Sequence, residues 1–204
     1  MGTRKIKTET PIANTRKIEA DVHELFVNRW SPRSFKSDPV DDSTLSSIFE
    51  AARWSMSCMN EQPWLFLYSK IDDTDRDDFN GLLVPGNREW ADSAPVLCFA
   101  LCRNNFERND KLNNWAQFDT GAAWMALSLQ ARMLGLYTHG MAGFDIDRSY
   151  EVLNVDRDKY TVIAVFVIGH RDDPDKLSEK NRESEQPNSR KSLDEITHRG
   201  KLTG

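Results

Sequence analysis

The sequence has few cysteines and no long apolar run, and each absence restricts its class. Its three cysteines (Cys58, Cys98 and Cys102) are an odd, sparse set that argues against a disulfide framework and favours a reducing compartment, here the cytoplasm. No apolar run approaches the roughly 20 residues that a membrane-spanning helix needs. The basic N-terminus lacks the apolar core of a secretory signal. We therefore expect a soluble globular protein with no membrane partner.

Strongly basic segments and metal-ligand spacings are also missing. The formal net charge is -5 and no long Lys/Arg block compensates for it, so we expect no nucleic-acid partner. The four histidines are scattered along the chain without the spacing of metal ligands, so we expect no metal site. What the sequence does contain, 39% hydrophobic and 29% charged residues over 204 positions, is enough to bury a substantial core.

Helical patterns occur in three places. Asp21 begins a capping-box pattern, and the helix that follows is expected to end before Ser31-Pro32. Asp41 and its neighbours offer N-caps for a second helix with a one-sided apolar stripe. A third, long helix is expected over residues 113–134, ended by Gly135. Its large apolar residues share one face, and small residues leave a patch where another backbone could approach.

Apolar runs predict buried strands between these helices, and the last run is expected to be covered on both faces. They span residues 64–68, 96–101 and 161–168. Residues 81–86 are expected to form a loop, and the charged stretch 171–191 a surface connection. Strands separated by helices indicate a three-layer α+β or α/β domain. We expect it to cover residues 21–204, after a flexible N-terminal arm over residues 1–20.

One short segment carries groups suited to a phosphate. Arg29 and Arg33 flank Ser31 where the first helix is expected to break. Arginine binds phosphate through paired hydrogen bonds, and serine adds a neutral donor. A capped, solvated helix end would have the same composition. By itself the segment leaves both interpretations open.

Two later loops offer polar groups and small residues. Residues 55–64 join a helix to a buried strand and present hydroxyl, amide and thiol groups, which suit the edge of a flat polar heterocycle. Residues 136–145 include two glycines around small side chains, where backbone N–H groups could approach a ligand. The alternatives are a capped loop ahead of a strand and, for His139, a structural histidine.

Taken in order, these segments resemble the nitroreductase family of FMN enzymes over about residues 22–201. The matching positions are Arg29, Ser31, Arg33 and Phe35; Ser57, Asn60, Gln62, Pro63 and Trp64; Asn87 and Trp90; Asp119, Gly121 and Ala123; Gly143, Phe144 and Asp145; and Arg190 to Ile196. No single motif is decisive, but their order is specific.

The resemblance implies a nitroreductase-like α+β fold. Its expected features are a three-layer α/β/α sandwich, a mostly antiparallel sheet, a long central helix and an extended C-terminal tail. It further implies an FMN-dependent oxidoreductase that passes hydride from NAD(P)H through flavin N5 to a small electrophilic acceptor, such as a nitroaromatic or a quinone. The expected assembly is a homodimer with FMN at the interface and the long helix in the dimer core.

The resemblance also implies roles for individual residues. The residues expected to hold the FMN phosphate are Arg29, Ser31, Arg33 and Arg190. Those expected to contact the ring system are Ser57, Cys58, Asn60, Asn87, Ala142 and Gly143. Met56 and Trp90 are expected to shape the substrate pocket. No catalytic side chain is expected, because the flavin itself carries the chemistry.

Three positions depart from the family pattern. Met56 replaces a usual proline, Cys58 replaces a usual serine, and Ala142 stands where some members carry glutamate. These departures concern the choice of substrate more than the binding of FMN. Two other functions stay open at this point: a flavin-binding relative with a different redox reaction, and a non-catalytic flavin-binding or interaction protein.

Overall fold

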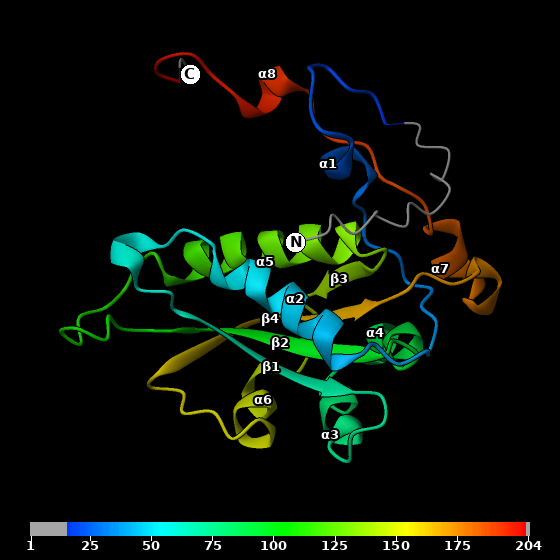
Figure 1. Ribbon diagram of the computed structural model, residues 1–204, viewed down its shortest axis with the longest axis horizontal. Helices are drawn as coiled ribbons and strands as arrows, with labels where there is room; N and C mark the ends of the chain where they lie inside the picture. The colour runs from blue at the N-terminus through cyan, green and yellow to red at the C-terminus, as the bar shows by residue number, and fades with distance from the viewer. Residues whose placement is uncertain (1–15, 203–204) are drawn as a thin grey trace.

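A four-stranded antiparallel sheet forms the centre of the computed structural model, which describes residues 16–202. The strands are β1 (Trp64–Lys70), β2 (Val96–Arg103), β3 (Tyr137–Met141) and β4 (Tyr160–Gly169), in the order β1-β2-β4-β3. The two central strands, β2 and β4, have continuous apolar sequences because helices cover both of their faces (Figure 1).

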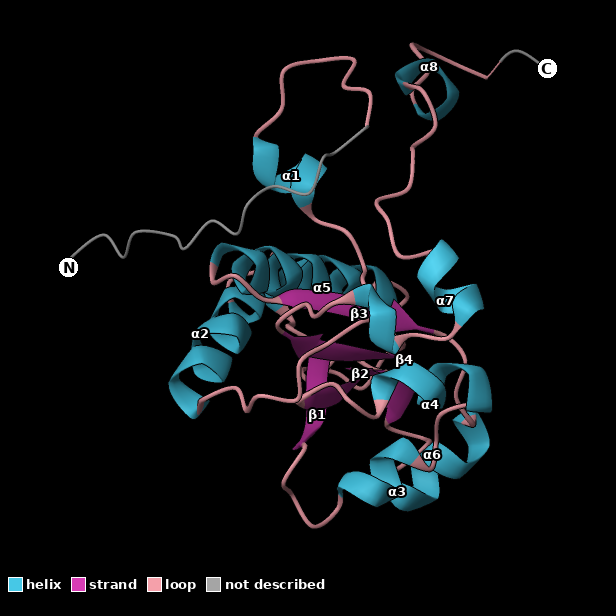
Figure 2. Cartoon of the chain, turned by 90° about the vertical axis from the view of Figure 1, so that its right-hand side faces the viewer, coloured by secondary structure: helices cyan, strands magenta, loops and turns pink. Residues whose placement is uncertain are grey.

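Helices cover the sheet on both sides, which gives three layers (Figure 2). One face is covered by α2 (Asp42–Arg53) and α5 (Ala116–Met133). The other is covered by α3 (Arg76–Asn80), α4 (Pro85–Ala91) and α6 (Ile146–Val152). The smaller elements α1 (Glu24–Asn28), η1 (Cys58–Asn60), η2 (Pro174–Lys176), α7 (Glu179–Glu183) and α8 (Leu193–Ile196) lie outside these layers. The predicted α+β sandwich with an antiparallel sheet is confirmed.

Strand β2 divides its side chains between two cores. Leu97, Phe99 and Leu101 point toward the α3, α4 and α6 side, whereas Val96 and Cys98 point toward α2 and α5. This alternation follows from the two-residue period of a strand. Cys98 lies in the run that was predicted to form a buried strand, and burial raises the pKa of its thiol.

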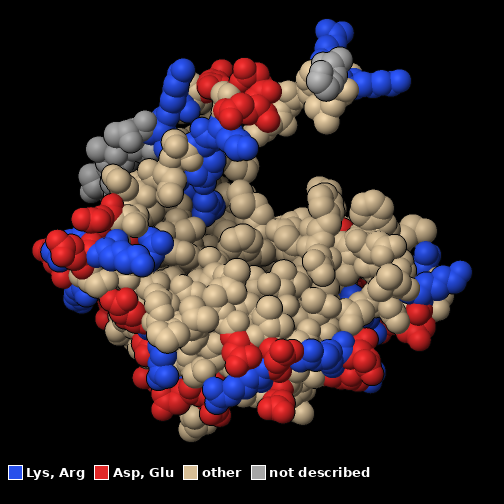
Figure 3. All heavy atoms as spheres, turned by 180° about the vertical axis from the view of Figure 1, so that it is seen from behind, with Lys and Arg blue, Asp and Glu red and all other residues tan. Residues whose placement is uncertain are grey.

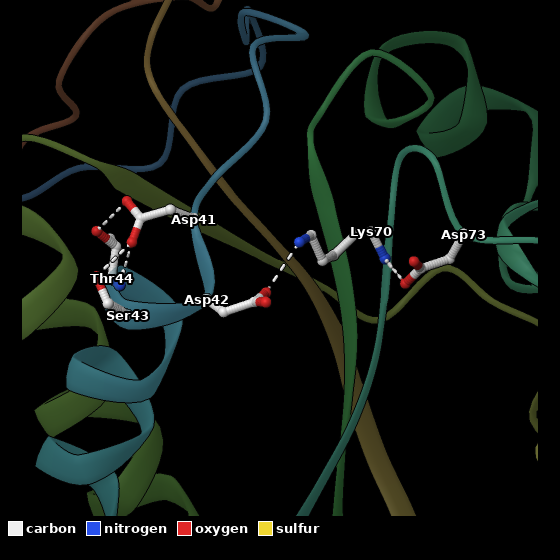
Figure 4. Close-up of polar contacts among 6 residues, drawn as sticks. All are labelled: Asp41, Asp42, Ser43, Thr44, Lys70 and Asp73. Atoms are coloured by element: carbon white, nitrogen blue, oxygen red, sulfur yellow. Dashed lines mark hydrogen bonds and ion pairs between the residues drawn. The ribbon is translucent and has the colours of Figure 1, made fainter.

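The start of α2 agrees with the sequence prediction. Asp41 is the N-cap residue, and its carboxylate accepts hydrogen bonds from the backbone N–H of Thr44 at 2.9 Å and from its hydroxyl at 2.7 Å. Hydrogen bonds from Ser43 and then Thr44 lower the pKa of Asp41. The next residue, Asp42, pairs with Lys70 at 2.9 Å and so links α2 to the end of β1 (Figure 4).

Three local predictions were wrong. Helix α1 begins at Glu24 and not near Asp21, because the Nδ1 atom of His23 accepts the Leu25 N–H at 3.1 Å and acts as the cap. Helix α4 begins at Pro85 inside the expected loop, where proline suits the first turn of a helix. Strand β3 lies within residues 136–145, where no strand was expected.

Helix α5 buries small residues and exposes large ones. Ala123, Leu127 and Ala131 pack on the sheet, whereas Phe118 on the outer side is 74% exposed. Other large apolar residues on this exposed side are Trp115, Met125 and Met133. The helix ends as predicted, with Gly135 following it at φ 84°. The described chain alone therefore leaves the large apolar face of its longest helix uncovered.

Candidate functional site

Arg29, Ser31 and Arg33 lie on one side of an extended segment that follows α1. Burial alternates along it: these three residues are half-buried, whereas Trp30 and Ser34 between and after them are buried. An extended backbone turns successive side chains to opposite sides, so the two arginines and the serine share the outer side. The Nη1 atom of Arg29 lies 3.5 Å from the Ser31 hydroxyl. The three N-terminal residues that were expected to bind phosphate therefore lie together in the folded chain.

Contacts from the sheet fix this segment in place. The Nδ1 atom of His139, on β3, donates to the carbonyl oxygen of Pro32 at 2.7 Å. The backbone N–H of Lys36 donates to His170, just beyond β4, at 2.9 Å. Burial lowers the pKa of His139 to about 4, and the nearby charges of Arg33 and Arg29 act in the same direction. His139 is therefore a neutral donor at pH 7.

A carboxylate from the C-terminal half holds the middle of the segment. Glu185 accepts the backbone N–H of Arg33 at 2.8 and 3.0 Å and that of Ser34 at 3.1 Å. The hydroxyl of Ser34 in turn donates to the carbonyl of Asp173 at 2.6 Å. With these backbone groups held, the Arg33 side chain extends from a fixed backbone. Glu185 lies in the charged stretch that was expected to be only a surface connection.

Both ends of the described chain reach this segment. The segment that carries Arg190 is linked to Arg29 by Arg16, whose guanidinium donates to the carbonyls of both Asn188 and Arg29. Burial and then the positive charge of Arg190 lower the pKa of Arg29. Arg16 also lies here and donates to the carbonyl of Arg29 at 2.9 Å. No motif marked Arg16, because its position depends on a contact between segments far apart in the sequence. Residues 1–15 of the expected arm lie outside the described residues.

The turn after β3 brings together two residues that were expected to contact the flavin ring, Asn87 and Gly143. The side-chain amide of Asn87, on α4, donates to the carbonyl of Gly143 at 2.9 Å, and the backbone N–H of Val84 donates to the same oxygen at 3.1 Å. The approach is close: a Cβ atom on Gly143 would lie 2.6 Å from the Asn87 amide nitrogen. Only glycine fits here without displacing Asn87. Ala142, beside it, is exposed.

The loop that contains Ser57, Cys58 and Asn60 has an unusual backbone. Asn60 has φ 57°, and two neighbouring residues, Met59 and Gln62, also lie in the left-handed region at 55° and 52°. The loop is held by the buried carboxylate of Asp119, which accepts the Cys58 N–H at 2.9 Å, and by the Ser57 hydroxyl, which accepts the Gln62 N–H at 2.9 Å. Backbone of this kind is concentrated at functional sites.

Within one chain the structure does not bring this loop to the extended segment that carries Arg29, Ser31 and Arg33, here called the phosphate segment. The loop ends at Pro63, whose carbonyl accepts the N–H of Arg103, the partner of Tyr160 at the start of β4. The phosphate segment bonds instead to His170, beyond the far end of β4. Ten residues of strand at about 3.3 Å each separate the two by roughly 30 Å. Figure 1 shows the turn between α2 and β1 at the opposite end of the sheet from the segment that follows α1.

The two residues expected to shape a substrate pocket have different environments. Met56 is 81% exposed at the start of the loop. Trp90 is only 4% exposed; it stacks on Phe35 and packs at a tilt against His139, with a centroid distance of 4.5 Å. Within the described chain Trp90 is a core residue that supports the phosphate segment from behind. Its aromatic character matched the motif, but burial places it away from the surface.

Among residues 16–202, every helix is too short or too polar to span a membrane. In the same range, no three side chains of the His, Cys, Asp and Glu types gather closely enough to hold a metal ion. The guanidinium of Arg16 and the hydroxyl of Ser31 lie near Arg29 and suit an anion, while the Glu185 carboxylate is occupied by the backbone N–H groups of Arg33 and Ser34.

Comparison with known proteins identifies the family. Residues 27–80 and 68–170 match the family model for nitroreductases. A Streptomyces coelicolor protein, provisionally named as an NADH dehydrogenase/NAD(P)H nitroreductase, is 29% identical over 168 residues, which are 72% of this chain and 81% of that protein. The solved structure of an oxidoreductase containing FMN is 37% identical, with a TM-score of 0.90 over 96% of this chain and 100% of that chain.

A more distant structure shares the fold. It is a Desulfovibrio desulfuricans protein in complex with FMN, provisionally named as a nitroreductase, at 22% identity and a TM-score of 0.69, covering 88% of this chain and 96% of that chain. Since the matched residues include most of the described chain, from the phosphate segment to the end of β4, the protein belongs to the nitroreductase family.

Proposed function

We propose that this protein is an FMN-dependent oxidoreductase that transfers hydride from NADH or NADPH to a small electrophilic acceptor, such as a nitroaromatic or a quinone. The observation that carries the proposal is that Arg29, Ser31 and Arg33 lie on one side of an extended segment, to which Arg16 links the segment that carries Arg190. The relative at 37% identity, whose name states that it contains FMN, supports the same cofactor.

The donor set fits the phosphate group of FMN. A phosphate monoester carries about −1.5 to −2 charges at pH 7 and offers three strong acceptor oxygens. Arg29, Arg33 and Arg190 would provide guanidinium groups, and Ser31 a hydroxyl. When bound, FMN supplies hydride acceptance and donation at its N5 atom. The protein's own contribution is to bind the phosphate and orient the ring.

The turn at Ala142 and Gly143 is the proposed contact for the ring system. Asn87 fixes this turn through the Gly143 carbonyl and leaves no space for a side chain at position 143. His139 lies on the strand that precedes this turn and is hydrogen-bonded to Pro32 in the phosphate segment. The contact therefore fixes the position of the phosphate segment relative to the proposed ring contact. Orientation of a cofactor depends on rigid support of this type.

We propose that the active form is a homodimer with FMN at the interface. The loop with Ser57, Cys58 and Asn60 is separated from the phosphate segment by the length of β4, roughly 30 Å, which is farther than one FMN molecule reaches. A two-fold axis beside α5 would bring the loop of a second copy to the phosphate segment of the first. The exposed Phe118 face of α5 supports this arrangement. So does the broad area with few charged side chains seen in Figure 3.

The substrate pocket would then lie between Met56 of one copy and the Ala142 turn of the other. Both residues are exposed in the single chain, and neither carries an ionisable group. An uncharged, partly apolar pocket suits a flat aromatic or quinone acceptor.

The two buried cysteines, Cys98 and Cys102, have no disulfide partner, in keeping with a reducing compartment such as the cytoplasm.

Stopped-flow reduction tests the proposed reaction. The purified holoprotein is mixed anaerobically with NADH or NADPH, and a nitroaromatic or quinone is added in a second mix. The proposal expects bleaching of flavin absorbance by at least one nucleotide and recovery on addition of the acceptor. A protein that binds FMN but is reduced by neither nucleotide would be a relative with a different reaction. A protein that binds no flavin would be an interaction protein.

A further inference from the structure

The N-terminal segment of the described chain is tied to both parts of the phosphate site by one side chain. The Nε atom of Arg16 donates to the carbonyl of Asn188 in the tail at 2.7 Å. Its Nη1 atom donates to the carbonyls of Val27 at 2.6 Å and Arg29 at 2.9 Å. One guanidinium therefore joins the tail to the end of α1 and to the start of the phosphate segment.

The carbonyls that Arg16 contacts adjoin the two predicted phosphate arginines. Arg29 supplies one of them directly, and Asn188 lies two residues before Arg190, whose side chain donates to the Ser189 carbonyl at 2.8 Å. A second contact supports the pairing of the chain ends, since the Leu193 N–H donates to Glu19 at 2.8 Å. In Figure 2, α1 and the tail leading to α8 lie above the same side of α5.

Positive charge accumulates where these segments meet. Burial, then the charge of Arg190 and then that of Arg29 lower the pKa of Arg16. Figure 3 shows Lys and Arg side chains gathered between the main body and the terminal segments. Guanidinium groups that repel one another at short range bind a dianion more strongly, because the anion removes the repulsion as well as adding its own attraction. A neutral ligand gains nothing from this arrangement.

We propose that Arg16 is a positioning residue of the FMN phosphate site, which holds the Arg190 segment against Arg29 and adds a further positive charge beside the phosphate. The inference rests on the proposed function, since it assigns Arg16 to the same cofactor. It goes beyond the motif residues, because it makes the segment before the first helix part of the cofactor site. The ligand chemistry is a phosphate monoester.

The inference predicts a difference between two flavins. Riboflavin has the same ring system as FMN without the phosphate. Removal of Arg16 therefore weakens FMN binding by about tenfold or more, the size expected for lost charge-assisted interactions, and leaves riboflavin binding nearly unchanged. Arg16→Gln keeps an amide donor for the carbonyls but removes the charge, so its loss of FMN affinity is smaller than that of Arg16→Ala and again spares riboflavin.

The test titrates the full-length apoprotein with FMN and, separately, riboflavin, and follows the quenching of flavin fluorescence. The variants are Arg16→Ala, Arg16→Gln and a control, Arg53→Ala, whose guanidinium is exposed on α2 and pairs with Glu50 at 2.6 Å. The expected result is a ratio of FMN to riboflavin affinity that falls about tenfold in Arg16→Ala and stays at the wild-type value in Arg53→Ala.

Two results would overturn the inference: wild-type FMN affinity in Arg16→Ala, or equal losses for FMN and riboflavin, which indicate a purely structural role. If Arg16→Ala does not fold, as judged by circular dichroism, the same ratio in Arg16→Gln decides. A wild-type apoprotein that binds neither flavin contradicts the proposed function itself, so the two failures are distinguishable.

Discussion

The Nδ1 atom of His139 lies 2.7 Å from the carbonyl oxygen of Pro32. This contact joins the strand that leads into the Ala142–Gly143 turn to the middle of the segment that carries Arg29 and Arg33. It connects the two parts of the proposed flavin site that lie within one chain. The Trp90 ring packs against the imidazole, with a centroid distance of 4.5 Å and an angle of 34° between the ring planes.

The burial of His139 predicts a loss of stability in acid. Its pKa is about 4 in the folded protein, below the usual value near 6.5 in the unfolded chain. The unfolded state therefore binds the proton first as the pH falls. The free energy of unfolding should decrease from about pH 6.5 to about pH 4, by up to about 3 kcal/mol from this residue.

Urea denaturation at several pH values measures this effect. The matched variant is His139→Gln, which keeps a donor for Pro32 but has no proton to gain. Its free energy of unfolding should vary less with pH in this interval than that of the wild type. Identical pH profiles for the two proteins would mean that His139 is not the group responsible.

Loss of the Glu185 carboxylate should loosen the phosphate segment. Glu185→Ala leaves the N–H groups of Arg33 and Ser34 without their acceptor, so we expect the free energy of unfolding to fall by about 1–3 kcal/mol. Glu185→Gln keeps one acceptor oxygen and should lose less. Glu183→Ala, on the exposed side of α7, serves as the control. Equal stability of Glu185→Ala and Glu183→Ala would contradict the assigned role.

Addition of one methyl group at position 143 should displace Asn87. The new Cβ would lie 2.6 Å from its amide nitrogen and 2.8 Å from Val84 Cγ2, so Gly143→Ala should lower stability by about 1–3 kcal/mol and weaken FMN binding. Gly86→Ala is the control, because no atom lies within 4 Å of its added Cβ. Thermal melts and flavin titration measure both effects, and wild-type values for Gly143→Ala would exclude the close contact.

A charge on the outer face of α5 should separate the proposed dimer. Phe118→Asp places a carboxylate in the expected interface, so the variant should elute as a monomer and lose FMN, because half of the ring contacts would come from the partner. Ile146→Asp changes an exposed apolar residue on α6 and should leave the assembly intact. Sedimentation velocity measures the assembly. A wild-type monomer with bound FMN would refute the interfacial site.

Some of the fold could be predicted because burial leaves a direct pattern in the sequence. Strands β2 and β4 are covered on both faces and read as continuous apolar runs. Strand β3 was missed because it is short, lies at the edge of the sheet and contains Thr138, His139 and Gly140. Helix α4 was missed because a proline and a glycine open its seven residues.

Some residues of the candidate site could likewise be predicted from the sequence, and others could not. Arg29, Ser31 and Arg33 were assigned through the order of the family motifs, and their closeness follows from an extended local backbone. Arg16 and Glu185 could not be predicted, because each acts through a contact with a segment far along the chain. The burial of Trp90 could not be predicted either, because a motif indicates the type of a residue but not the direction in which its side chain points.

Flavin occupancy of purified wild-type protein, compared with the double variant Arg29→Ala, Arg33→Ala, tests whether these two arginines hold the FMN phosphate. The control is a second double variant, Arg53→Ala, Arg157→Ala, which removes two exposed arginines from other sites. We expect FMN in the wild type and the control, and a folded but largely flavin-free Arg29→Ala, Arg33→Ala protein. Full FMN occupancy in that variant, or no flavin in the wild type, would contradict the proposed FMN site.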